Sequence, residues 1–246
     1  MAEKNWPVFW GMLALALALV VMGGLVSHSF LAVKRANDEI TVTGSARKPI
    51  RSDLILWTCS VSGRGATRPD AYREVKRYTD QVLAYLKAQK VADNEITLES
   101  LQTTPLYQTE RMGEGEVNRI LVGYELVQSI SIQSPNVDAI SALSRKITDL
   151  IEQGVPLNSE PPSFYFTKLS EMRVQMLGEA TKDALQRARI MVEAAGADVG
   201  ALRSMRAGVF QITPRNSTDV SGYGENDTTA LEKDITAVVT ATFAVE

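Results

Sequence analysis

The sequence predicts an α+β fold in which mostly antiparallel sheets pack with three main helices, preceded by one N-terminal transmembrane helix. Three observations support this class. Apolar and polar residues alternate over several short segments, most clearly at 235–245, as in half-buried strands. Three longer segments repeat apolar residues at spacings of three and four, which is typical of amphipathic helices. The run 8–27 contains no charged residue.

Residues 1–35 are expected to form an uncleaved membrane anchor. A helix of about 20 residues spans roughly 30 Å, the thickness of the hydrocarbon core of a bilayer, and the run 8–27 reaches that length. A cleaved signal peptide is the alternative, but its apolar region would be about 7–15 residues followed by a small-x-small site. Ser27-His28-Ser29-Phe30 is a poor site of that kind. The residues expected at the two membrane interfaces are Trp6, Trp10, Lys34 and Arg35.

Two strands are expected after the anchor. Alternation predicts the first at 40–44, and Pro49 is interpreted as its break because proline cannot donate to a strand ladder. The second is predicted at 55–61. Gly63-Arg64-Gly65 is interpreted as a turn that ends it, since glycine commonly marks turns.

A helix and a long hairpin are expected next. Thr67 can cap a helix that runs to Lys87–Lys90, where positive charge suits the helix end. Segments 96–107 and 120–132 are predicted to be the strands of the hairpin, around the polar tip 110–116.

The second half of the domain is expected to add two helices and further strands. Its predicted elements are a helix from 134–136 to Gly154, a strand at 164–166, a helix at 170–195, and strands at about 202–212 and at 235–245. The polar segment 213–233 exceeds about 15 residues, a length at which loops are usually functional or disordered. The predicted order is approximately ββαββ, α, β, α, ββ.

Small side chains recur every four residues in the helix at 170–195, at Ala180, Ala184 and Ala188. Such a row lets another backbone approach closely. A helix lying on a sheet of the same chain is the favoured interpretation, and a subunit contact through these alanines is the alternative.

Composition excludes several kinds of function. The net charge of −3 lacks the basic excess of a nucleic-acid binder. One cysteine, Cys59, excludes an internal disulfide, and one histidine, His28, excludes metal sites with two histidines. Cys59 alternates with Trp57 and Val61 on an apolar strand face, so a buried structural thiol is expected in preference to a redox scavenger.

No set of residues points to catalysis. Neither a Walker A loop nor a G-x-G-x-x-G fingerprint is present. Glu110, Glu114 and Glu116 lack the spacing of a calcium loop, so a solvated tip is favoured. We therefore expect no enzyme, no catalytic residues, no cofactor and no metal. A hydrolase that uses carboxylates is the least favoured alternative.

Several segments, in their order and spacing, are similar to one known family. They are ITVTG at 40–44, LQTTPLY at 101–107, GYEL at 123–126, EATKDALQRA at 179–188, ADVGAL at 197–202, and the final strand. Together they resemble the SIMPL domain (DUF541) family, which includes the oxidative-stress defence and 28-kDa outer-membrane antigen types. The chain departs from the family pattern at Ala46, where a second glycine is common, and at Ser52-Asp53, where Pro-Asp is usual.

The resemblance covers about residues 38–246 and implies a SIMPL-like α+β domain over 36–246 behind the anchor. It implies an envelope protein linked to stress tolerance, and some members of the family form ring-like oligomers. Together with the anchor and the absence of a catalytic set, the resemblance predicts a non-enzymatic protein that self-associates as a ring or scaffold. A periplasmic adaptor or binding module for another envelope protein is the alternative. It also implies a single-pass protein of the bacterial inner membrane with its C-terminal domain in the periplasm. Lys34 and Arg35, counted by the positive-inside rule, weakly favour the cytoplasm instead.

Overall fold

The computed structural model describes residues 6–35, 38–111, 117–217 and 221–246. Two compact units divide the chain. Unit 1 comprises Met1–Arg47, Arg173–Phe210 and Thr236–Glu246, and unit 2 comprises Lys48–Met172 and Gln211–Ile235. The α+β class with largely antiparallel sheets is confirmed.

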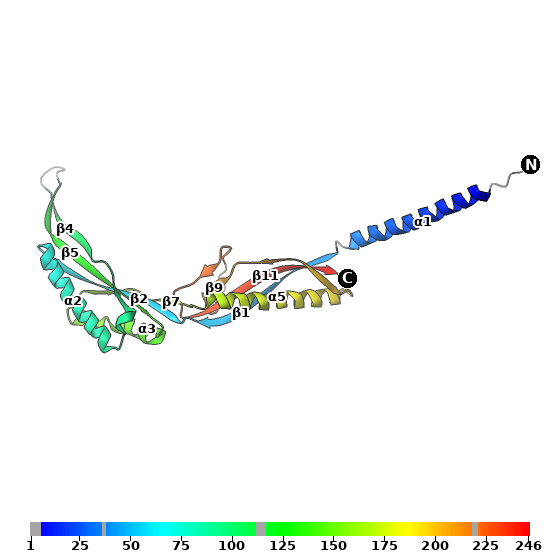
Figure 1. Cartoon of the computed structure of the whole chain (residues 1–246). Helices are drawn as coiled ribbons and strands as arrows, with labels where there is room; N and C mark the ends of the chain where they lie inside the picture. The colour runs from blue at the N-terminus through cyan, green and yellow to red at the C-terminus, as the bar shows by residue number, and fades with distance from the viewer. Residues whose placement is uncertain (1–5, 36–37, 112–116, 218–220) are drawn as a thin grey trace, which may run out of the picture. The chain divides into compact units, whose positions relative to one another are not determined.

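The first described element is α1 (Trp6–Arg35), drawn in blue in Figure 1. Its described side chains run from Trp10 to Gly24, and all of them are exposed. The side chains of Trp6, Lys34 and Arg35 lie outside the described part of the chain. Over the residues that are described, no helix is long and apolar enough to cross a membrane. The anchor predicted at 1–35 therefore stays a prediction.

Unit 1 is built on a sheet in which β11 (Glu232–Val245) pairs with both β1 (Glu39–Arg51) and β8 (Val199–Ala207). The pairing of β8 with β11 is antiparallel, with Ala207 opposite Val239. Alternate residues of β11 are buried, as the sequence predicted, and the others face away from the core. The buried apolar set in β11 is Ile235, Ala237, Val239, Ala241 and Phe243, with Ala244 beside them.

The helix α5 (Leu169–Ala194) packs in unit 1 through one row of side chains. Its buried residues are Met176, Ala180, Ala184, Ala188 and Val192, which repeat every four positions. Ala184 and Ala188 share a core with Val42, Ala241 and Phe243. Small side chains on this row allow the helix axis to approach the strands closely.

Unit 2 has its own antiparallel sheet. The strand β2 (Leu54–Gly65) pairs along one edge with β5 (Val117–Ser134) and along the other with β6 (Leu157–Ser159) and β7 (Ser163–Tyr165). The strands β3 (Ile96–Leu98) and β4 (Gln102–Arg111) both pair with β5. Two short strands, β9 (Gln211–Pro214) and β10 (Glu225–Asn226), pair in parallel.

The helices of unit 2 are α2 (Arg68–Ala88), α3 (Val137–Lys146) and the short α4 (Asp149–Glu152), with a 3-10 turn at Asp93–Glu95. Thr67 caps α2 as predicted, because its hydroxyl accepts a hydrogen bond from the N–H of Asp70. The core of the unit gathers residues from β2, β5, α2 and α3. Its centre includes Trp57, whose indole N–H donates to the Ser159 hydroxyl at 3.1 Å.

Two sequence interpretations near β1 and β2 are wrong. Pro49 does not end the first strand, which continues to Arg51. Because β1 lies at an end of the strand order of its sheet, the missing N–H of the proline is tolerated there. Gly63-Arg64-Gly65 is part of β2, with Gly63 opposite Leu126, and is not a turn. A Cβ on Gly63 would lie 2.4 Å from the backbone nitrogen of Val75, so the glycine lets α2 approach the strand.

Other segments are more divided than the sequence indicated. The segment 96–107 spans two strands, β3 and β4, and the predicted helix ending at Gly154 is two helices, α3 and α4. The predicted strand at 202–212 corresponds to β8 and β9. The segment 213–233 contains the end of β9, β10 and the start of β11, and residues 218–220 lie outside the described part.

Candidate functional site

The hairpin of β4 and β5 extends past the rest of its sheet. The register of β2 along β5 stops at Tyr124, whereas β4 continues with β5 to the pair Arg111–Val117. Among the described strands, residues 117–123 therefore have β4 as their partner. Figure 1 shows this two-stranded arm projecting beyond the start of α2. We define the arm as residues 106–111 and 117–123.

Large apolar side chains on the arm are exposed to solvent. They are Tyr107 (56% exposed), Ile120 (42%), Leu121 (47%) and Val122 (50%). Because Ile120, Leu121 and Val122 are consecutive in one strand, they point alternately to both faces of the ribbon. A two-stranded ribbon is marginally stable in water on its own, and the exposed apolar side chains make the arm a candidate contact surface.

Charged side chains of both signs lie near the end of the arm. Glu110 and Arg119 are exposed on β4 and β5. Glu114 and Glu116, considered above as cation ligands, lie outside the described residues. Within the described chain, no group of three or more His, Cys, Asp or Glu residues is placed to hold a metal ion.

The alanine row of α5 is fully buried inside unit 1. Ala180, Ala184 and Ala188 are each 0% exposed. A Cβ on Gly44 of β1 would come 2.3 Å from the carbonyl oxygen of Ala180, so strand and helix backbones are in direct contact. The row packs against its own sheet. These alanines therefore expose no side-chain surface through which a second subunit could make contact, which was the alternative interpretation.

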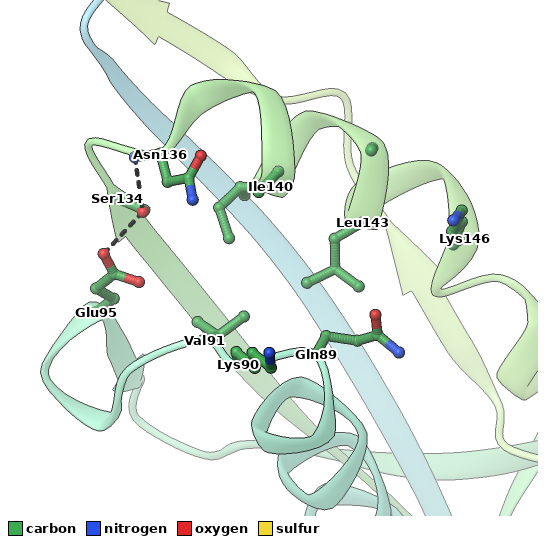
Figure 2. Close-up of a pocket in the computed structure, with 11 residues that line it drawn as sticks. Gln89, Lys90, Val91, Glu95, Ser134, Asn136, Ile140, Leu143 and Lys146 are labelled. Atoms are coloured by element: carbon green, nitrogen blue, oxygen red, sulfur yellow. Dashed lines mark hydrogen bonds between the residues drawn. The ribbon is translucent and has the colours of Figure 1, made fainter.

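A pocket of about 270 Å³ lies in unit 2 between the end of α2 and α3 (Figure 2). Val91, Ile140 and Leu143 supply buried apolar side chains that face one another across it. Gln89, Lys90, Asn136 and Lys146 surround them with exposed polar side chains.

The acidic residue of this pocket is already engaged. One oxygen of Glu95 accepts a hydrogen bond from the Ser134 hydroxyl at 2.8 Å, and the other accepts from the Ala92 N–H at 3.4 Å. The Ser134 hydroxyl in turn accepts from the N–H of Asn136 at 3.0 Å. These contacts join the 3-10 turn after α2 to the start of α3 and give one wall of the pocket a fixed shape.

Lys233 is a buried lysine that sequence analysis did not single out. Its side chain is 2% exposed, and Nζ donates to the carbonyl oxygens of Phe164 (2.7 Å) and Asp227 (2.5 Å). The Asp227 carboxylate lies 3.9 Å away. Burial lowers the pKa of Lys233, and the charge of Asp227 opposes that effect. The sequence indicated this burial, because Lys233 stands two residues before Ile235 and so falls on the buried face of β11.

Cys59 is fully buried in the core of unit 2, which confirms the sequence prediction. Burial, assisted by the negative charge of Glu160, raises the pKa of its thiol to about 12. A thiol in this state carries almost no thiolate at neutral pH, and the thiolate is the reactive form. The geometry therefore gives no support to redox scavenging by Cys59.

Comparison with known proteins identifies the family. The chain matches the SIMPL family, described as "Protein of unknown function (DUF541)", over residues 40–243. The chain belongs to the SIMPL family. A relative is "Uncharacterized protein YggE" of Edwardsiella ictaluri (strain 93-146), which is 22% identical over 227 residues covering 89% of each chain. The SIMPL match spans strands of both units, from the start of β1 to near the end of β11.

Proposed function

We propose that this SIMPL protein is a membrane-anchored, non-enzymatic envelope protein that self-associates through the β4–β5 arm. The exposed apolar surface of the arm, formed by Tyr107, Ile120, Leu121 and Val122, carries the proposal. Covering these side chains removes apolar area from water, which is the main favourable term in protein association. The non-enzymatic part of the proposal rests on the absence of a recognisable catalytic motif from the sequence.

A second copy of the chain is the proposed occupant of this surface. Two copies present the same apolar residues of the arm to each other, and a two-fold symmetric contact uses the same patch of both subunits. Glu110 and Arg119 lie near the end of the arm with opposite charges, so each can face its opposite on a second arm. In the part of the chain that the structure describes, the outer edges of the arm pair with no other strand, so they can also hydrogen-bond to another strand.

The proposed anchor is α1. Its support is the uncharged run 8–27, together with the exposed apolar side chains from Trp10 to Met22 along the helix. A helix that is apolar on all sides needs an apolar environment. Trp6, Trp10, Lys34 and Arg35 would mark the two interfaces.

The proposed location is the bacterial inner membrane, with a single pass and the C-terminal domain in the periplasm. Its support is the resemblance of the domain to envelope proteins, and a role in stress tolerance rests on the same resemblance. Fusing a reporter that is active only in the periplasm to the C-terminus tests the orientation. Activity of the reporter supports the proposal, and an inactive reporter on a stable fusion contradicts it.

Native mass spectrometry of the full-length protein in detergent tests the assembly. We expect a defined oligomer for the natural chain. Leu121→Lys places a charge in the contact and should shift the population to monomers. Val174→Lys is the matched control, since Val174 is a 73% exposed apolar residue of α5 and is not part of the arm; it should leave the oligomer intact.

A monomer at all concentrations would contradict self-association. An oligomer that Leu121→Lys leaves unchanged would contradict the arm as its contact. If the chain is monomeric while Leu121→Lys abolishes crosslinking to one defined envelope protein, the adaptor alternative replaces self-association.

A further inference from the structure

The pocket between α2 and α3 has the form of a small-ligand site. Its volume of about 270 Å³ is just below the range of about 300–1,000 Å³ typical for drug-sized ligands. Figure 2 shows Val91 facing Ile140 and Leu143 across the space, with Asn136 and Gln89 directing their amides toward it. Such pockets combine an apolar lining with a few polar groups that orient the ligand.

The charge around the pocket favours an anion. Lys90 and Lys146 are both exposed, and in the described chain neither ammonium group has a carboxylate partner. Glu95 is the acidic residue of the lining, and its two oxygens already accept hydrogen bonds from Ser134 and Ala92. Two lysines and one glutamate leave a single positive charge, which suits a monoanion.

Lys90 is held in an unfavourable backbone conformation. Its φ of 64° lies in the left-handed region, where glycine is the usual residue at the end of a helix. The surrounding hydrogen bonds fit a Schellman motif, with Val91 N–H donating to Leu86 and Lys90 N–H to Lys87. A lysine in place of glycine stores strain at this position, and strained residues concentrate at functional sites.

A favourable interaction with the helix dipole does not explain why a lysine occupies this strained position. A positive charge near the C-terminus of a helix is favourable, but Lys87 already supplies one in the last turn of α2. Lys87 is also paired with Asp93 at 3.1 Å. Lys90 therefore adds a second cation at a conformational cost, and its side chain lines the pocket.

The amide of Asn136 supplies a further donor. Asn136 precedes α3, but its side chain makes no capping hydrogen bond. In Figure 2 this amide lies between Ser134 and Ile140 and points into the pocket. A carboxylate can accept from the amide and from an ammonium group together, because it has two oxygens.

We propose that this pocket binds a small amphipathic monocarboxylate. The apolar body lies on Val91, Ile140 and Leu143, and Lys90 and Asn136 hold the carboxylate. Lys146, at the other end of α3, adds positive charge to the rim of the pocket. The binding site is independent of the arm, so it does not depend on self-association.

Fluorine NMR of 4,4,4-trifluorobutanoate with the full-length protein in detergent tests the proposal, with protein-free micelles as the blank. We expect saturable binding, and no comparable binding of the uncharged 4,4,4-trifluorobutan-1-ol. Lys90→Gly is the decisive variant. It should weaken binding at least tenfold while raising the midpoint of thermal unfolding, because glycine relieves the strain at φ 64°.

Lys146→Met should also weaken binding, and Lys87→Met, outside the pocket lining on the same helix end, should leave it unchanged. Binding that Lys90→Gly and Lys146→Met do not alter would overturn the proposal. So would the absence of saturable binding, or equal binding of the alcohol. Competition by inorganic phosphate as strong as by unlabelled butanoate would show recognition of charge alone and would overturn the amphipathic ligand.

Discussion

The backbone of Gly44 lies directly against that of Ala180: a Cβ on Gly44 would be 2.3 Å from the Ala180 carbonyl oxygen. The same Cβ would be 2.3 Å from the backbone nitrogen of Ala184. The next residue reinforces the contact, because the N–H of Ser45 donates to the Asp183 carboxylate at 2.7 Å. The position of α5 on β1 is thus set by a missing side chain and a neighbouring hydrogen bond.

Gly44→Ala should destabilise unit 1. The added methyl group overlaps with backbone atoms, which cannot move aside as a side chain can. Overpacking of this kind costs about 1–3 kcal/mol. Urea unfolding followed by circular dichroism would measure the loss.

Gly178→Ala is the matched control for that substitution. Gly178 is in α5, and a Cβ there would meet no atom within 4 Å. Alanine is favoured over glycine in a helix interior by about 0.5–1 kcal/mol, so this variant should be more stable than the natural chain. Equal effects of the two substitutions would contradict the proposed close contact at Gly44.

Asp183 should contribute to loss of stability in acid. The hydrogen bond from the Ser45 N–H, with the charge of Arg187, lowers the pKa of Asp183 below its usual 3.8. Between the folded and unfolded pKa values the unfolded chain binds more protons, so stability rises with pH there. The contribution is present above about pH 4 and is lost as the pH falls through the lower, folded-state pKa.

Asp183→Asn removes this titration while leaving an oxygen that can accept from Ser45. We expect the variant to lose less stability between pH 6 and pH 2 than the natural chain, as measured by urea unfolding across that range. A variant with the same acid sensitivity would show that Asp183 does not contribute to it.

The alternating strands and the amphipathic helices were predictable because their signal is local. The buried row of α5 and the alternation in β11 agree with the structure nearly residue by residue. Gly63 and Gly65 were misinterpreted because their role depends on α2, a separate element whose backbone packs against them. Pro49 was misinterpreted because strand order, which decides whether an N–H is needed, is not local information.

The candidate site was less predictable than the fold. Lys233 was assigned to the polar segment 213–233, although it lies buried at the start of β11. At 120–122, Leu121 is apolar where alternation would place a polar residue, and all three side chains are exposed. Lys90 carried no such signal, since a lysine near a helix end is ordinary in sequence. Its importance depends on a backbone angle and on α3, which follows it across a hairpin.

Cys59 should be inert in the folded protein. Its thiol is 0% exposed and its pKa is raised to about 12, so a thiol reagent at pH 8 should label the native chain slowly and the urea-unfolded chain at once. Cys59→Ser buries a hydroxyl in the core and should cost about 1–3 kcal/mol. Rapid labelling of the native chain would restore a redox role for this residue.

Lys233 should hold the segment that contains Asp227 against β7. Lys233→Met removes the ammonium group and leaves the carbonyl oxygens of Phe164 and Asp227 without their donor. Breaking a buried pair by removing one partner typically costs about 3–5 kcal/mol. The Asp227 carboxylate keeps its hydrogen bonds from the Thr229 and Ala230 N–H groups, which places the expected loss at the lower end.

Hydrogen exchange shows where in the structure Lys233→Met reduces stability. The Phe164 N–H donates to the carbonyl of Thr228 at 2.7 Å, and the Asp227 N–H donates to Ile212 at 2.9 Å. Both amides should exchange faster in Lys233→Met, while those of α5 should not. Adding Asp227→Asn removes the charge left without its partner, so the double variant should recover part of the lost stability. A Lys233→Met protein as stable as the natural chain, with unchanged exchange at Phe164, would show that the buried lysine does not hold this segment.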